Sequence, residues 1–426
     1  MGGGPEKEHL LIVLWQPEPK DVTAEIQRRF PHFEIKYFQQ LPPEGGQIVD
    51  KREQVPQELW QWATILITLS SLPARAEDAP NLKLIHLFMA GVDHYSNHPI
   101  VTDSDIPITS SSGIHGPPIA EWIVMTTLVL SRRYATEYEW QKQHHWGTGR
   151  EMLIDGTDWV GKTVGIAGYG SIGRQVERCI EPSADILGGG GGTAARVFKA
   201  LGSNIHAYTA GARATPVVRN KRPLLPALKF PERPLLIHAL AHGSWARGKE
   251  SRRDNGYIVP GTGDPDGTVP RAWYSGTTKE SLHAFLSSGL DALVIALPLT
   301  PSTRHLFSTR EFEILANTTH AADGTPKKSR SAYLINIARG PLVDQPALKA
   351  ALDNGVLLGA ALDVTDPEPL PADDPLWDAK NVIITPHISG HGTEYALRAY
   401  DVFMVNWARH ERGEKMFNLL DRHKGY

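Results

Sequence analysis

Three ionisable residues in the last quarter of the chain each follow an apolar run that is typical of a β-strand. Arg339 stands in LINIARG, Glu368 in ALDVTDPEP and His387 in ITPHISG. In an open α/β sheet, ligands bind outside the carboxyl ends of the strands. The pattern therefore predicts that these three side chains project into one crevice.

The three residue types suit the reduction of a carbonyl that lies beside a carboxylate. The fork of Arg339 could grip the carboxylate, His387 could give a proton to the carbonyl oxygen, and Glu368 could hold the imidazolium charged. The hydride would come from a bound cofactor. Taken singly, each residue also has an ordinary interpretation, as a surface arginine, a capping glutamate or a core histidine.

A glycine-rich stretch, residues 162–173 with the sequence KTVGIAGYGSIG, predicts where that cofactor binds. The apolar run before it indicates a strand, and the GxGxxG spacing follows directly. Gly168 would permit the tight turn, Gly170 would let the backbone approach a diphosphate, and Gly173 would let the next helix pack closely. Ser171 and Ile172 complete the predicted loop, and the diphosphate would lie at the helix N-terminus.

The next strand-like run, NIHAYT, ends in Thr209. At this position, NAD enzymes with such a glycine-rich loop usually have an acidic residue. A carboxylate would bind the ribose 2'-hydroxyl and repel a 2'-phosphate, whereas Thr209 leaves room and Arg213 offers a positive charge. The sequence thus favours NADP over NAD, although Arg213 could instead face solvent.

Apolar runs alternate with helical stretches along most of the chain, which predicts an α/β fold of two Rossmann- or flavodoxin-like domains with parallel sheets. We expect the cofactor domain at residues 117–388 and a discontinuous substrate domain at 1–116 and 389–426. Predicted strands lie at residues 9–15, 33–38, 63–69, 83–88, 204–209, 291–297, 332–337, 359–364 and 381–385, besides the one before the glycine loop. After the fourth run, the backbone N–H groups of Ala90, Gly91 and Val92 could hold a carboxylate or form a plain turn.

Three stretches interrupt this alternation and are interpreted as insertions. The first, residues 177–194, carries Pro182 and a run of five glycines where the phosphate-binding helix should continue. The second, residues 217–249, is basic and rich in proline, and the third, residues 318–331, is a polar spacer. Without an aromatic stacking pattern, the basic stretch is expected to be a solvated loop rather than a nucleic-acid arm.

Composition narrows the class of protein. A chain of 426 residues with 41% hydrophobic residues can build two cores. The net charge of -3 argues against nucleic acid or an anionic membrane as partner. The single cysteine, Cys179, excludes an internal disulfide and a cysteine-based zinc site, so we expect a cytoplasmic protein without a metal site. The N-terminal apolar run is too short for a signal peptide or membrane span.

The motifs together resemble the D-2-hydroxyacid dehydrogenases, including glyoxylate and hydroxypyruvate reductases. GYGSIG, LPLTPSTRHLF, INIARG, GAALDVTDPEP and ITPHISG occur in the family order, downstream of MAGVDHY. The resemblance implies that Arg339, Glu368 and His387 are catalytic and that the backbone at Ala90 to Val92 grips the substrate carboxylate. It also implies that Leu297 and Pro298 lie beside the adenine, that Asp363 contacts the nicotinamide carboxamide, and that Ala338 belongs to the cofactor site. A cleft between the domains and a homodimer formed through the cofactor domain are further implications.

The expected activity is therefore reduction of a small 2-oxo acid, such as glyoxylate or hydroxypyruvate, to the D-2-hydroxy acid. Formate dehydrogenases share the scaffold but resemble this chain with Gln where Glu368 stands, and an acid there fits carbonyl reduction better. The sequence is also compatible with a nucleotide-sensing corepressor and with a family member that its insertions have inactivated.

Overall fold

The computed structural model describes residues 7–41, 51–92, 95–149, 156–169, 198–211, 259, 269–316, 318–320, 326–328 and 332–422. These residues form two compact units. Unit 1 holds the described residues up to Ile114 and from Thr393 onward, and unit 2 holds those from His115 to Gly392. Unit 1 is therefore discontinuous in the sequence, as the sequence predicts.

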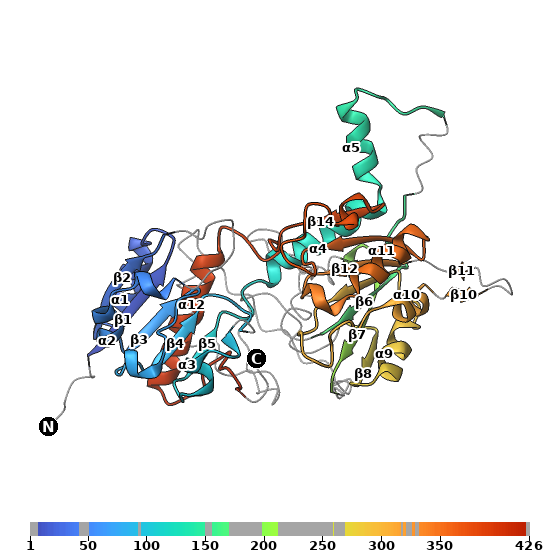
Figure 1. The fold of residues 1–426 in the computed structure, drawn as a ribbon. Coiled ribbons are helices and arrows are strands. Elements are labelled where there is room, and N and C mark those ends of the chain that lie inside the picture. Colours follow the sequence, from blue (N-terminus) through green and yellow to red (C-terminus); the bar gives the residue numbers. More distant parts are fainter. Residues whose placement is uncertain are drawn as a thin grey trace, which may run out of the picture. The chain divides into compact units, whose positions relative to one another are not determined.

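Unit 1 is built on a five-stranded parallel sheet with the order β2-β1-β3-β4-β5 (Figure 1). This is the flavodoxin-like order. Its strands are β1 (Glu8–Leu14), β2 (Phe33–Gln39), β3 (Ile65–Thr68), β4 (Leu84–Leu87) and β5 (Ile108–Ser110). Its helices are α1 (Lys20–Arg29), η2 (Arg52–Gln54), α2 (Gln57–Trp62), η3 (Ala76–Asp78), α3 (Pro99–Thr102) and α12 (Tyr395–Glu411).

The C-terminal helix α12 is part of the core of unit 1. Phe403 and Trp407 on this helix are almost fully buried, and Trp407 meets Phe33 of β2 edge to face with ring centroids 5.1 Å apart. The buried His86 of β4 bonds through Nε2 to the carbonyl oxygen of Ala399 at 3.2 Å. These contacts hold the end of the chain on the first sheet.

Unit 2 is built on a seven-stranded parallel sheet with the order β14-β13-β12-β9-β6-β7-β8. Numbered within the unit, this is the Rossmann order with one further strand. The strands are β6 (Thr163–Ala167), β7 (Asn204–Thr209), β8 (Ala272–Ser275), β9 (Ala292–Ile295), β12 (Ala332–Asn336), β13 (Leu357–Leu362) and β14 (Val382–Ile384). The helices are α4 (Gly116–Ser131), α5 (Tyr134–Lys142), α9 (Lys279–Leu286), α10 (Thr309–Leu315), η7 (Gly340–Leu342), α11 (Gln345–Asp353) and η8 (Pro375–Asp378).

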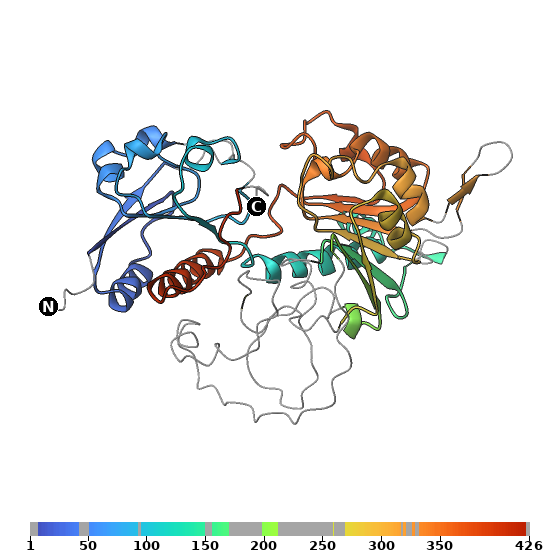
Figure 2. The same ribbon diagram turned by 90° about the horizontal axis from the view of Figure 1, so that it is seen from below.

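Both faces of the second sheet are covered. One core contains apolar residues of α9, α10 and α11, and the other contains those of α4 together with Phe198 (Figure 2). Accordingly, every residue of β6, β9 and β12 is buried. This burial explains why these strands appear in the sequence as short continuous apolar runs.

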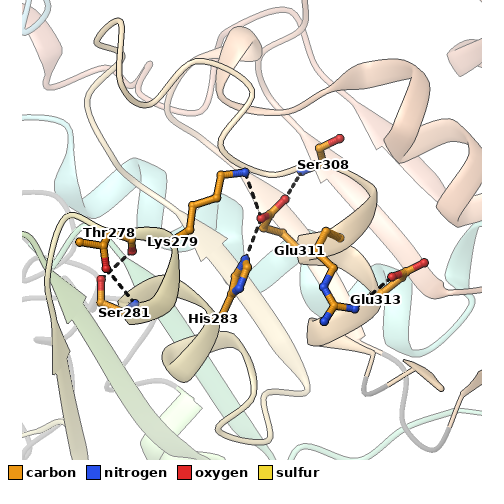
Figure 3. A network of polar contacts seen from close by, with 8 residues as sticks. Thr278, Lys279, Ser281, His283, Ser308, Glu311 and Glu313 are labelled. Carbon is orange, nitrogen blue, oxygen red and sulfur yellow. Dashed lines mark hydrogen bonds and ion pairs between the residues drawn. The ribbon is translucent and has the colours of Figure 1, made fainter.

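Helices α9 and α10 are joined by a buried carboxylate (Figure 3). Glu311, only 1% exposed, accepts a hydrogen bond from the backbone N–H of Ser308 and so caps the start of α10. Its other oxygen lies 2.9 Å from Nε2 of His283 and 3.5 Å from Nζ of Lys279, both on α9. The polar cluster therefore fixes the angle between two helices that cover the sheet.

Two parts of unit 2 differ from what the sequence predicts. The stretch 318–331, expected as a spacer, contains the antiparallel strands β10 (Thr318–His320) and β11 (Pro326–Lys328), which form a sheet of their own. Helix α5, which the sequence does not predict, extends from the rest of unit 2 (Figure 1) and buries none of its residues. Of the helices within the described ranges, none is both long and apolar enough to cross a bilayer.

Candidate active site

The predicted cofactor loop begins where the strand order of unit 2 reverses, between β6 and β9. Gly168 follows β6 with a φ of +97°. A Cβ atom there would lie 2.4 Å from the carbonyl oxygen of Ala296, the residue directly after β9. Only glycine fits this turn without strain. Leu297 and Pro298 follow on the neighbouring loop, with Pro298 exposed. Dinucleotides bind at such a switch point, so this edge fits the cofactor.

Thr209 is the last residue of β7, and its predicted role in favouring NADP stays a prediction. Thr209 is 8% exposed, and its hydroxyl donates to the carbonyl oxygen of Gly211 at 2.9 Å. The remaining residues of the predicted loop, Gly170, Ser171, Ile172 and Gly173, lie outside the described residues, as does Arg213. The same holds for the predicted insertions at 177–194 and 217–249.

His387 and Glu368, nineteen positions apart, form a hydrogen-bonded pair. Nδ1 of His387 lies 2.7 Å from Oε1 of Glu368, and the two side chains are 46% and 41% exposed. The carboxylate occupies one ring nitrogen and leaves Nε2 as the atom that could give a proton to a substrate. This is the arrangement that general acid catalysis by an imidazolium requires.

The surroundings of Glu368 keep it ionised. Partial burial acts to raise the pKa of its carboxyl, but the hydrogen bond and charge of His387, the backbone N–H of Thr365 and the charge of Arg339 together lower this pKa below its ordinary value. Arg339 is thus close enough to act on the pair electrostatically. The three residues that the sequence singles out belong to one local charge network.

The backbone around Arg339 is fixed by its own segment. Asn336, at the end of β12, accepts a hydrogen bond from the N–H of Ala338 and donates to the carbonyl oxygen of Arg339. The guanidinium donates from Nη1 to the carbonyl oxygen of Ala338 at 2.8 Å. A Cβ atom on Gly340 would lie 1.8 Å from the carbonyl oxygen of Thr365, so the Arg339 and Glu368 segments pack backbone against backbone.

Asp363 holds the loop that carries His387, a role that the sequence does not reveal. Its carboxylate, in a residue only 1% exposed, accepts from the Thr385 hydroxyl at 2.6 Å and from the N–H groups of Ile388 and Ser389 at 2.9 Å. These bonds fix a loop in which His387 takes a left-handed φ of 57°. Such a conformation persists where the surroundings over-determine it. The predicted contact of Asp363 with the nicotinamide stays a prediction.

The third predicted group lies in unit 1, directly after β4. Val92 is buried, whereas Ala90 and Gly91 are partly exposed. Among the described residues, none of the three backbone N–H groups donates to a protein acceptor. Three such donors at the end of a parallel strand are suited to a carboxylate.

Fold and site together define a doubly wound α/β protein with a dinucleotide-type switch point and an Arg, Glu and His charge network beside it. The model of the D-isomer specific 2-hydroxyacid dehydrogenase, NAD binding domain, matches residues 124–184 and 264–389. Over these residues, which lie in unit 2, the chain matches the D-isomer specific 2-hydroxyacid dehydrogenase family.

Individual proteins of known sequence or structure are also similar to this chain. A glyoxylate reductase of Thermofilum pendens is 26% identical over 362 residues, which cover 84% of this chain and 81% of that protein. Glyoxylate/hydroxypyruvate reductase B of Salmonella paratyphi B is 42% identical over 111 residues, 26% of this chain and 30% of that protein. The NADPH-dependent glyoxylate/hydroxypyruvate reductase of Sinorhizobium meliloti, solved with NADP and sulfate, shares the fold with a TM-score of 0.61 at 23% identity, covering 99% of this chain and 100% of that one.

Proposed function

We propose that this chain reduces a small 2-oxo acid, such as glyoxylate or hydroxypyruvate, to the D-2-hydroxy acid with NADPH. The observation that supports this proposal most directly is the 2.7 Å hydrogen bond between His387 and Glu368. The charge of Arg339 acts on the same carboxylate. The glyoxylate reductases among its relatives support the choice of substrate class.

Each residue of the network has one task in this proposal. Arg339 binds the substrate carboxylate, and the N–H groups of Ala90, Gly91 and Val92 are the further proposed donors to it. His387 protonates the carbonyl oxygen from Nε2 while Glu368 stabilises the imidazolium through Nδ1. The bound nicotinamide supplies the hydride. Leu297, Pro298 and Ala338 line the proposed cofactor site.

Removing the proton donor or the residue that binds the substrate carboxylate should strongly reduce turnover without loss of cofactor binding. We expect His387→Ala and Arg339→Ala each to lower kcat/KM for glyoxylate on the order of a hundredfold or more. Arg310→Ala, which removes an exposed arginine paired with Glu313, is the matched control and should retain activity. Steady-state oxidation of NADPH measures this, and wild-type turnover in either site variant refutes the assignment.

The proposed preference for NADPH rests on the end of β7. Thr209 is buried and neutral, so nothing at that position repels a 2'-phosphate, and a structural neighbour binds NADP. We expect a higher kcat/KM with NADPH than with NADH, and a reversal of this preference in Thr209→Asp. Measuring both cofactors on both proteins decides it, and a wild-type preference for NADH contradicts the proposal.

We further propose a cytoplasmic homodimer that associates through unit 2. Helix α5 supports this because it buries none of its residues, and Tyr134 and Tyr138 on it are 49% and 46% exposed. Exposed aromatic side chains on a projecting helix are typical of interfaces. Light scattering of the purified chain measures its oligomeric state.

The alternative function is that of a corepressor. A protein that binds NADPH and a peptide but turns over no 2-oxo acid would be a corepressor rather than a reductase.

A further inference from the structure

The loop that carries Glu368 is closed by a single side chain from another element. Gln345 is the first residue of α11. Its Oε1 accepts a hydrogen bond from the backbone N–H of Asp366 at 3.1 Å, and its Nε2 donates to Oδ2 of Asp374 at 3.1 Å. One amide group therefore spans the entrance and the exit of residues 366–374, and Glu368 lies between the two bonded positions.

Other hydrogen bonds each hold a single point of the loop: the Thr365 hydroxyl donates to the carbonyl oxygen of Pro367 at 2.9 Å, and Nε1 of Trp377 donates to that of Pro371 at 2.8 Å. Pro367, Glu368 and Pro369 are exposed, and the first apolar side chain to pack on the core is the partly buried Leu370. At the entrance, the Asp366 carboxylate lies 3.5 Å from Arg304 and 3.8 Å from His305, both at least half exposed. Exposed ion pairs of this length contribute little. Within the described residues, Gln345 is the side chain whose hydrogen bonds reach both ends of the loop from outside it.

The last residue of the loop, Asp374, is held in place by its own contacts. The Gln345 amide therefore connects the Glu368 loop to a fixed position. Oδ1 of Asp374 accepts from the N–H of Leu376 at 2.8 Å and caps η8, in which Leu376 is 1% exposed. Gln345 itself is fixed at the start of α11, where Asp344 caps the helix by accepting from the N–H of Ala347. The bond between Gln345 and Asp374 thus joins the capped starts of α11 and η8.

We propose that Gln345 is a positioning residue that holds Glu368 against His387, and this rests on the proposed function. A bond of 2.7 Å between a half-exposed carboxylate and an imidazole needs both loops fixed to a fraction of an ångström. Asp363 fixes the His387 loop, and Gln345 does the same for the Glu368 loop. The charged groups that act on Glu368 in this arrangement are His387 and Arg339.

Gln345→Met tests the proposal because Met keeps the length of the side chain and removes both hydrogen bonds. Lys349→Met is the matched control, since Lys349 lies one turn further along α11 and pairs only with the exposed Asp353 among the partners described. We expect kcat for 2-oxo acid reduction to fall roughly three- to tenfold in Gln345→Met, with KM nearly unchanged. Reduction should also fail at a lower pH than in the wild type, because a Glu368 carboxylate that is not held in place stabilises the His387 imidazolium less.

A readout that needs no turnover separates this proposal from the proposed function. In ¹⁵N NMR spectra of the imidazole, the signal of His387 Nδ1 should show the loss of its hydrogen bond in Gln345→Met and not in Lys349→Met. If the wild type reduces no 2-oxo acid, the proposed function fails while the spectra still decide the role of Gln345. A wild-type Nδ1 signal and pH profile in Gln345→Met overturn the positioning role, whether or not the variant is less stable.

Discussion

The Glu368 carboxylate shows how one residue depends on its partners. Burial alone would raise the pKa of this carboxyl, and the interactions with His387 outweigh that effect. We therefore expect His387→Ala to raise the pKa of Glu368, because the variant loses the hydrogen bond and the positive charge together. A pH titration of the ¹³C carboxyl signal measures it. In His305→Ala, which removes a histidine paired with Asp366, the titration should match the wild type.

An unchanged Glu368 titration in His387→Ala would mean that the hydrogen bond between the two side chains is not present in solution.

The residues of this site also show what a sequence can reveal about single residues. Arg339, Glu368 and His387 can be predicted because each ends an apolar run, and parallel strands end at one edge. The bonds of Asp363 and Gln345 join residues 21 to 29 positions apart, and no periodicity signals such contacts.

At the scale of elements, the buried contact between α9 and α10 should make unit 2 sensitive to acid. Burial tends to raise the pKa of Glu311, but His283, the N–H of Ser308 and Lys279 lower it on balance. A carboxyl whose pKa is depressed by folding stabilises the protein above its unfolded pKa, about 4.3, and this contribution is lost as the pH falls through the folded value.

Glu311→Gln should therefore lower the free energy of unfolding by about 1–2 kcal/mol near pH 7, and this deficit should shrink below about pH 4. Denaturant unfolding at several pH values measures it. Glu313→Gln, on the same helix with a longer bond to Arg310, is the control and should change little. A deficit that is the same at pH 7 and pH 3.5 would show that shape rather than charge matters at this position.

Two of the strands that the sequence does not predict are very short. β5 and β8 are edge strands of only three and four residues. Runs of this length are too short to show a clear period, and β8 has no fully buried residue. The edge position itself is not the cause, because β2 and β14 are also edge strands and are predicted. The inner strands, covered on both faces by helices, are predicted to within a few residues. Sheet order, by contrast, follows from crossover rules that need every strand, so the sequence predicts the class of fold better than its topology.

At the scale of the whole molecule, we expect the interruption of the predicted cofactor domain to affect how tightly it binds NADPH. The family model matches up to residue 184 and again from residue 264, yet β7 lies in the skipped range and pairs with both β6 and β8. Phe198, just before β7, is fully buried and packs against Trp159. The sheet is therefore continuous through a part of the chain that the family model does not match.

Removing residues 177–194 should improve cofactor binding. The deletion joins Val176 to ARVFKALG, and the sequence then predicts one continuous helix from the glycine loop to Gly202, with the buried Phe198 on it. With the insertion, the sequence predicts only about two helical turns after the loop, and a short helix keeps its dipole aimed at the diphosphate less firmly. Because loop closure costs grow only logarithmically with length, the full chain should still fold.

We expect the deletion variant to bind NADPH more tightly and to turn over glyoxylate faster than the full chain, as measured by calorimetric titration and steady-state rates. A second variant, in which a flexible Gly-Ser segment of equal length replaces residues 177–194, is the control and should bind as weakly as the full chain because the helix is still interrupted. If the deletion variant binds NADPH more weakly than both, residues 177–194 contribute contacts of their own to the cofactor site, and the helix is not the element that limits affinity.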